Sequence, residues 1–314
     1  MKEFDLLAKV YAANATLPPT VTLPPGDDMG AVRIGSSDTL VTVDQIADGI
    51  HFELEHTSLE RIGRKAITRN LSDVAAMGAI PAGAVVAACL PRDFGEERAL
   101  ALFTAMRQTA GDFQCPLFGG DISMWDGKLI LSVTVLAAMP AGISPILRSG
   151  AKPGDLICVT GQLGGSLEDL QGYVHHLDFT PRLRVGQKLA ADPAIRPSSM
   201  LDLSDGLSRD IGHLCSPGGL GATIEIDRLP VSPAAMQAAQ RDGQPAWRHA
   251  LVDGEDYELC FTLAPEKLAA IGREIEGVSI TVVGKITADP GVVSCDAQGN
   301  TRPMEALGWE HHGS

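Results

Sequence analysis

The fold of the first half of the chain is decided by the stretch TSLERIGRKAITRNLSDVAAMG, which occupies residues 57–78. Its apolar residues recur every three or four positions, as on one face of an α-helix, at Leu59, Ile62, Ala66, Ile67, Leu71 and Val74. Thr57 and Glu60 have the spacing of a capping box, and Gly78 is a typical helix stop. The stretch therefore predicts a helix over residues 58–77.

Short β-branched segments flank this helix and alternate with helical patterns. In the first half they predict strands over residues 39–43, 84–90 and 129–136 and a second helix over 96–111. In the second half the same signals predict strands over 156–160, 223–226, 258–263 and 279–283, and helices near 182–191, 206–215 and 265–275. Both halves are therefore predicted to be mixed α/β units.

Pro140 to Gly154 interrupt these patterns with proline and glycine, as a connector would. A chain of 314 residues also exceeds what one hydrophobic core usually organises. We therefore expect two domains, 1–140 and 141–314.

The composition excludes several functional classes. A net charge of -14, without a Lys/Arg-rich stretch, argues against nucleic acid as a partner. The six cysteines are scattered, as in a reduced cytoplasmic protein. The longest apolar stretch, residues 75–90, is interrupted by glycine and proline and is too short for a bilayer, and acids at the N-terminus argue against export. We expect a cytoplasmic protein without a membrane partner.

Aspartates recur where apolar segments give way to loops, at Asp27, Asp28, Asp44, Asp73, Asp121, Asp202 and Asp205. Taken singly, each could serve a turn, a helix cap or a hairpin. If they converge, a hard divalent cation is needed to offset their repulsion, and several aspartates suggest more than one Mg²⁺ with a polyphosphate.

The motifs of several other enzyme classes are missing from the sequence. There is no G-x-x-x-x-G-K-[ST] loop, no protein-kinase motif set and no G-x-S-x-G nucleophile elbow. Arg148 is suited to a phosphate oxygen or is a solvated linker residue, and His51 is a substrate contact or a structural hydrogen-bonder. The residues alone indicate a metal-polyphosphate enzyme and leave its acceptor open.

The motifs taken together resemble the thiamine-monophosphate kinase family over nearly the whole chain. The matching segments, in order, are Gly26-Asp27-Asp28, Val41-Thr42-Val43-Asp44, Asp48 to Phe52, Asn70 to Gly78, Gly119-Gly120-Asp121, Arg148 to Asp155, Asp202 to Leu207 and Gly254 to Leu259. This resemblance implies a two-domain α/β fold of the aminoimidazole ribonucleotide synthetase type, with a homodimer built from N-terminal sheets. It also implies transfer of phosphate from ATP to thiamine monophosphate.

The resemblance assigns roles to individual residues. It implies Mg²⁺ binding by Asp28, Asp44, Asp73, Asp121, Asp202 and Asp205, with Asp27 in the same loop. Nucleotide phosphates or metal would contact Thr42, Gly120, Arg148 and Ser204, and the thiamine moiety would contact His51, Glu255 and Trp309. Of these, Asp44, Asp121, Asp205 and Arg148 would be catalytic. An aromatic face at Trp309 suits a cationic ring.

Three positions depart from the usual family pattern: Val43 and Ile122 replace threonines, and Asp253 replaces a glycine. Loss of two hydroxyls would weaken support for the metals. One alternative is therefore a non-catalytic module that binds nucleotide or thiamine phosphate. Another is a different ATP-dependent enzyme of the same superfamily.

Overall fold

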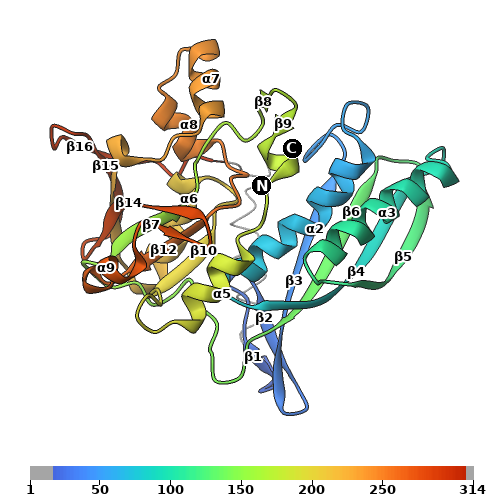
Figure 1. Cartoon of the computed structure of the whole chain (residues 1–314), viewed down its shortest axis with the longest axis horizontal. Helices are drawn as coiled ribbons and strands as arrows, with labels where there is room; N and C mark the ends of the chain where they lie inside the picture. The colour runs from blue at the N-terminus through green and yellow to red at the C-terminus, as the bar shows by residue number, and fades with distance from the viewer. Residues whose placement is uncertain (1–16, 309–314) are drawn as a thin grey trace.

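Helix α2 (Leu59–Ala76) lies at the centre of the molecule, between two β-sheet units (Figure 1). The computed structural model describes residues 17–308. The predicted helix is confirmed, but its N-cap is Ser58 rather than Thr57, with the Ser58 hydroxyl accepting a hydrogen bond from the Arg61 N–H. The helix ends before Gly78, whose left-handed backbone (φ 69°) suits glycine.

The first unit is a six-stranded sheet in the order β1-β2-β3-β6-β4-β5, in which only β4 and β5 run parallel. Helices α2 and α3 (Glu96–Asp112) lie side by side on one face of it (Figure 1). The strands are β1 (Val21–Leu23), β2 (Gly30–Ile34), β3 (Ser37–Ala47), β4 (Ile80–Pro91), β5 (Leu117–Trp125) and β6 (Ile130–Ala138).

The second unit contains a larger sheet in the order β10-β12-β7-β14-β11-β15-β16, with β13 paired to β14. Its strands are β7 (Leu156–Thr160), β10 (Ser199–Asp202), β11 (Gly221–Glu225), β12 (Leu259–Leu263), β13 (Glu274–Ile275), β14 (Val278–Thr287), β15 (Gly291–Cys295) and β16 (Thr301–Pro303). Strands β8 (Asp169–Leu170) and β9 (Tyr173–Val174) form a separate hairpin. The helices are α4 (His175–Asp178), α5 (Leu183–Ala191), α6 (Leu207–Cys215), α7 (Pro233–Asp242), α8 (Ala246–Val252) and α9 (Leu268–Ile271).

The predicted strands and helices of both halves are present except in one segment. The prediction of a helix over 265–275 is wrong. This segment consists of a 3₁₀ turn (Pro265–Lys267), the four residues of α9 and then β13. Gly272 (φ 70°) ends α9. Glu276 and Gly277 both have positive φ and turn β13 back onto β14, which is the backbone of a two-residue hairpin.

The two units share a tightly packed contact between α2 and α5. A Cβ on Gly186 would lie 2.0 Å from the Ala75 carbonyl oxygen, and one on Gly78 would lie 2.4 Å from the Ala190 Cβ. One continuous hydrophobic core includes residues from both units, such as Leu71, Leu189 and Phe261. This contact sets the spacing between α2 and the second sheet.

None of the helices in residues 17–308 is both long and apolar enough to cross a bilayer. All six cysteines fall in this range and none forms a disulfide.

Candidate active site

Three carboxylates from three separate segments meet at the junction of the two units. Asp28 lies in the loop before β2, Asp73 in the last turn of α2 and Asp202 at the end of β10. One oxygen from each lies within 4.8 Å of those from the other two. Only 7% of Asp28 and 5% of Asp202 is exposed, so water does little to screen this charge. We call Asp28, Asp73 and Asp202 the aspartate cluster.

Hydrogen bonds from neighbouring side chains orient each member of the aspartate cluster. The Thr42 hydroxyl donates to Asp73 at 2.5 Å, and the Ser72 hydroxyl donates to Asp202 at 2.6 Å. Arg148 donates from Nη2 to Asp28 Oδ1 at 2.8 Å, whereas Asp28 Oδ2 is buried without a hydrogen-bond partner. A buried carboxylate oxygen with unused lone pairs, beside two further carboxylates, fits a hard cation such as Mg²⁺.

The electrostatics of the aspartate cluster favour protonation when no cation is present. Burial, and then the negative charge of Asp28, raises the pKa of Asp202 to about 7. Burial and the nearby charge of Asp44 raise the pKa of Asp73 well above its usual range. A bound divalent cation would replace these protons.

These shifts predict that the metal-free protein loses stability as pH rises. A carboxyl with a raised pKa binds its proton more tightly in the folded state, so its contribution declines from about pH 4 until the pH passes the folded pKa near 7. Urea denaturation in EDTA at several pH values between 5 and 8 measures this decline. Asp202→Asn should show a shallower decline than wild type in EDTA, and Mg²⁺ should reduce the decline of wild type. Equal slopes for the two proteins in EDTA would contradict the prediction.

Asp44 and Asp27 lie beside the aspartate cluster. Asp44, on β3, pairs with Arg69 Nε at 3.3 Å, and its backbone N–H donates to the Asn70 side chain at 3.1 Å. Asp27 accepts a 2.5 Å hydrogen bond from the backbone N–H of Arg148, which joins the β1–β2 loop to the connector between the units. Asp44 faces the cluster closely enough to raise the pKa of Asp73.

The segment after β10 contains Ser204 and Asp205. The backbone N–H groups of Asp205 and Gly206 donate to Asp210 at 3.1 Å, and the Ser204 carbonyl accepts from the Glu255 N–H at 2.7 Å. Asp210 is buried, and burial together with the charge of Asp205 raises its pKa. Sequence analysis missed Asp210, although its place one helical turn after Gly206 was a signal for a loop-fixing acid.

Gly120 and Asp121 are not at a strand end, as the sequence suggested, but in the middle of edge strand β5. Asp44 is aligned with Val133 on β6, then Val86 on β4, then Gly120 on β5. The next residue, Asp121, therefore points to the opposite sheet face, three strands from Asp44 or roughly 14 Å. Within one chain, Asp121 does not join the aspartate cluster.

Two of the residues expected to contact thiamine are linked through Lys65, which sequence analysis missed. Lys65 Nζ donates to the His51 carbonyl at 2.9 Å and to both Glu255 carboxylate oxygens at 2.8 and 2.9 Å. The His51 ring accepts from the Ala47 N–H at 3.1 Å. Trp309 lies outside the described residues. The signal for Lys65 was its spacing of eight residues from Asp73, which places both on one face of α2.

The departures from the family pattern have distinct surroundings. Val43 is 61% exposed on the sheet face opposite Thr42 and Asp44, so the missing hydroxyl does not adjoin the aspartate cluster. Ile122 is 54% exposed on β5. Asp253 accepts a 2.7 Å hydrogen bond from the Gly165 N–H.

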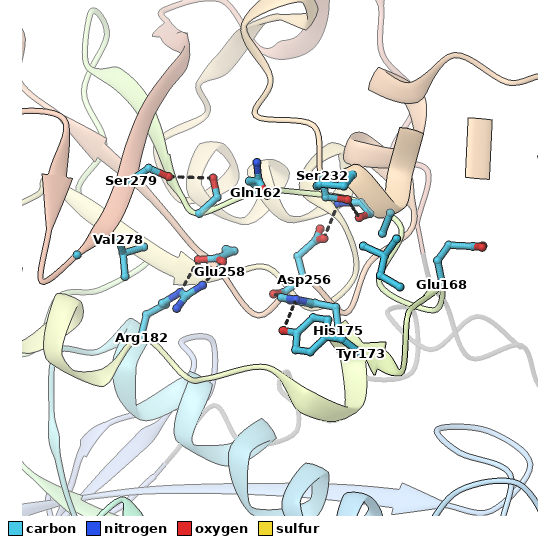
Figure 2. Close-up of a pocket in the computed structure, with 16 residues that line it drawn as sticks. Gln162, Glu168, Tyr173, His175, Arg182, Ser232, Asp256, Glu258, Val278 and Ser279 are labelled. Atoms are coloured by element: carbon cyan, nitrogen blue, oxygen red, sulfur yellow. Dashed lines mark hydrogen bonds and ion pairs between the residues drawn. The ribbon is translucent and has the colours of Figure 1, made fainter. Parts of the chain in front are cut away.

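A cavity of about 480 Å³ opens in the second unit beside the glycine-rich segment after β7 (Figure 2). Of the predicted site residues that the structure describes, none lines this cavity. Among the described residues that line the cavity, Arg182 is the single arginine and there is no lysine. The Arg182 guanidinium points at Glu258, with Nε 2.7 Å from Oε2 (Figure 2). The cavity therefore provides no unpaired arginine or lysine for a phosphate.

Comparison with known proteins gives a consistent family. Residues 26–139 match the model of the AIR synthase related protein, N-terminal domain, and residues 152–296 match that of the C-terminal domain. Thiamine-monophosphate kinase of Rhodopirellula baltica is 40% identical over 249 residues, 79% of this chain and 76% of the relative. That of Salmonella typhimurium is 35% identical, with 98% of each chain covered. The solved structure of AaThiL complexed with AMPPCP and TMP superposes with a TM-score of 0.84 at 27% identity, covering 99% of this chain and 97% of that one.

Proposed function

The chain belongs to the thiamine-monophosphate kinase family of AIR synthase related proteins, and from this membership we propose that it transfers the γ-phosphoryl group of ATP to thiamine monophosphate. The products are thiamine diphosphate and ADP. The observation that carries the proposal is the aspartate cluster at the junction of the two units, at segments where the family motifs occur. Its oriented carboxylates suit a metal-bound polyphosphate.

The chemistry requires little beyond positioning and charge compensation. An ionised oxygen of the acceptor phosphate attacks the γ-phosphorus in line, and the bond from that phosphorus to the leaving ADP oxygen breaks. The acceptor is already ionised at neutral pH, so no residue has to remove a proton. Several Mg²⁺ ions, when bound, would offset the repulsion between the two anions.

We assign the predicted site residues to three tasks. The Arg148 guanidinium donates to Asp28, and this contact supports a role for Arg148 beside the proposed metal ions. We assign Mg²⁺ to Asp27, Asp28, Asp44, Asp73, Asp121, Asp202 and Asp205, nucleotide phosphates to Thr42, Gly120, Arg148 and Ser204, and the thiamine moiety to His51, Glu255 and Trp309.

We also place the domain boundary at residue 140, between the end of β6 and the start of β7.

We further propose that the chain works as a homodimer in which Asp121 serves the partner's site. Two features support it: the register sets Asp121 on the sheet face away from Asp44, and α2 and α3 lie on the Asp44 face, where Arg69 of α2 pairs with Asp44 (Figure 1). Edge strand β5 also exposes apolar side chains, at Phe118 (62%), Ile122, Met124 and Trp125. An uncovered apolar sheet edge favours pairing with another chain.

The proposed function is tested by an assay of purified protein with ATP, Mg²⁺ and thiamine monophosphate. Thiamine diphosphate and ADP should form in equal amounts, and EDTA should abolish both, since the acidic site cannot hold a polyphosphate without a cation. Unphosphorylated thiamine, which lacks the ionised acceptor, is the control and should give no product. ATP consumption with another acceptor would favour a different enzyme of the superfamily, and binding without turnover would favour a non-catalytic module.

A further inference from the structure

Lys65 is a fully buried lysine that connects three segments of the chain. It projects from the middle of α2 and has no exposed surface. Its ammonium group donates to the His51 carbonyl and to Glu255, and lies 2.7 Å from His176 Nδ1 on α4. A buried ammonium group is costly unless it is paired and hydrogen-bonded, and here its hydrogen-bonding capacity is filled.

Glu255 is held in one orientation by groups on several sides. Both of its oxygens accept from Lys65, and Oε2 lies 3.0 Å from His176 Nδ1. The Tyr257 hydroxyl donates to Oε1 at 3.1 Å. Lys65 and Glu255 carry opposite charges, so their direct pairing at 2.8 Å provides charge compensation for the buried ammonium group.

The backbone that carries Glu255 is in an unfavourable conformation. Glu255 (φ 52°) and Tyr257 (φ 50°) both have left-handed backbone, which costs non-glycine residues energy and persists only where surrounding contacts impose it. Stacking of Tyr257 on Phe179, with ring centroids 4.1 Å apart, fixes one side of this segment. Lys65 fixes the Glu255 carboxylate itself.

Lys65 and Asp73 lie on the same face of α2, eight residues apart. This spacing corresponds to about 12 Å along the helix axis. One end of the helix face therefore holds Glu255 and the His51 segment, and the other end carries a member of the aspartate cluster. A single rigid helix thus sets the distance between the end that would hold the organic part of the acceptor and the end that would hold phosphates.

We propose that Lys65 is the positioning residue of the acceptor site, which acts through Glu255 to place the thiamine moiety relative to the aspartate cluster. This inference rests on the proposed function, because it takes Glu255 as a contact of thiamine monophosphate. Lys65 itself does not touch the reacting atoms. Its removal should weaken acceptor binding and leave ATP binding unchanged.

Lys65→Met tests this role, and Arg61→Met is the matched control. Arg61 lies one helical turn before Lys65 and also joins α2 to α4, by a bidentate pair with Asp178 at 2.9 and 2.7 Å, without contacting Glu255. Lys65→Met should raise KM for thiamine monophosphate on the order of 10- to 100-fold, the size expected for a lost charged hydrogen bond. Its KM for ATP and its kcat, and all three constants in Arg61→Met, should stay within about 3-fold of wild type.

The double variant Lys65→Met/Glu255→Gln shows whether the effect passes through Glu255. If it does, Lys65→Met should add little to the KM increase that Glu255→Gln causes alone. Full additivity would overturn the proposal, as would a KM increase no larger than that of Arg61→Met or an equal effect on ATP. If Lys65→Met does not fold, Lys65→Arg replaces it in the same comparison, with a smaller expected increase because the charge is kept.

A calorimetric titration with thiamine monophosphate separates this proposal from the proposed function. If the wild-type protein binds thiamine monophosphate but does not turn it over, the kinase activity is refuted and the role of Lys65 is not. Selective loss of thiamine monophosphate binding in Lys65→Met, against retained binding in Arg61→Met, would still support Lys65 as the positioning residue. Equal binding by both variants would refute it.

Discussion

Asp73→Asn should lower magnesium-dependent turnover on the order of 10³-fold, the size seen when one charge-stabilising group is removed from a catalytic site. Asp73 is the member of the aspartate cluster that α2 supplies, and the Thr42 hydroxyl already donates to one of its oxygens. An amide at this position keeps the shape but removes the charge that would hold a cation. Steady-state assays at saturating ATP, over a range of Mg²⁺ concentrations, measure the loss.

The same substitution should stabilise the protein in EDTA at pH 8, because it removes a carboxyl group whose ionisation is disfavoured by burial and by the charges of Asp44 and Asp202. A higher denaturation midpoint with lost activity would separate a functional role from misfolding. Asp38→Asn is the control, since Asp38 is an exposed acid near the start of β3, where it pairs with Arg33. Near-normal turnover by Asp73→Asn would remove Asp73 from the metal site.

Mixing Asp44→Asn with Asp121→Asn should restore activity that neither variant has alone. If Asp121 serves the partner's site, a mixed dimer has one site that lacks both aspartates and one that is intact. Random exchange of equal amounts makes half of the dimers mixed, so about one quarter of wild-type activity should return. The experiment requires unfolding and refolding of the mixture, or co-expression, to exchange subunits.

Two controls make the complementation specific. Asp44→Asn mixed with Asp73→Asn should stay inactive. Each of these substitutions damages the site of the subunit that carries it, so both sites of the mixed dimer are incomplete. Refolding each variant alone should also restore nothing. Activity that fails to return in the first mixture, while its dimers form by size-exclusion chromatography, would place Asp121 outside the partner's site.

Local sequence signals were sufficient for most elements. The apolar period of residues 58–77 and the glycine that follows it identify α2, since helix periodicity and helix stops depend on neighbours a few residues apart. The prediction for residues 265–275 was wrong because the helical pattern was given more weight than Gly272 and the Glu276-Gly277 turn. The positive φ values of Glu276 and Gly277 create a hairpin. The turn was readable from glycine, but the pairing of β13 with β14 decided the outcome.

The candidate site could be predicted only in part. Its aspartates were recognisable as motifs, yet the sequence could not say that Asp28, Asp73 and Asp202 meet whereas Asp121 points to the other sheet face. A one-residue step along a strand reverses the direction of a side chain, so the register of three strand pairs had to be known. Asp210 escaped notice because its partners are backbone N–H groups.

The sequence by itself determined the family, the α/β class and the central helix, because motifs and periodicity are written in short stretches of chain. Only the tertiary structure decided which charged groups face one another. Lys65 and Glu255 are 190 residues apart, and Arg148 and Asp28 are 120 apart, and no local pattern relates such residues. Lysine usually lies on protein surfaces, and Lys65 is buried because the second unit packs over this part of α2 and supplies Glu255 and His176 as its partners.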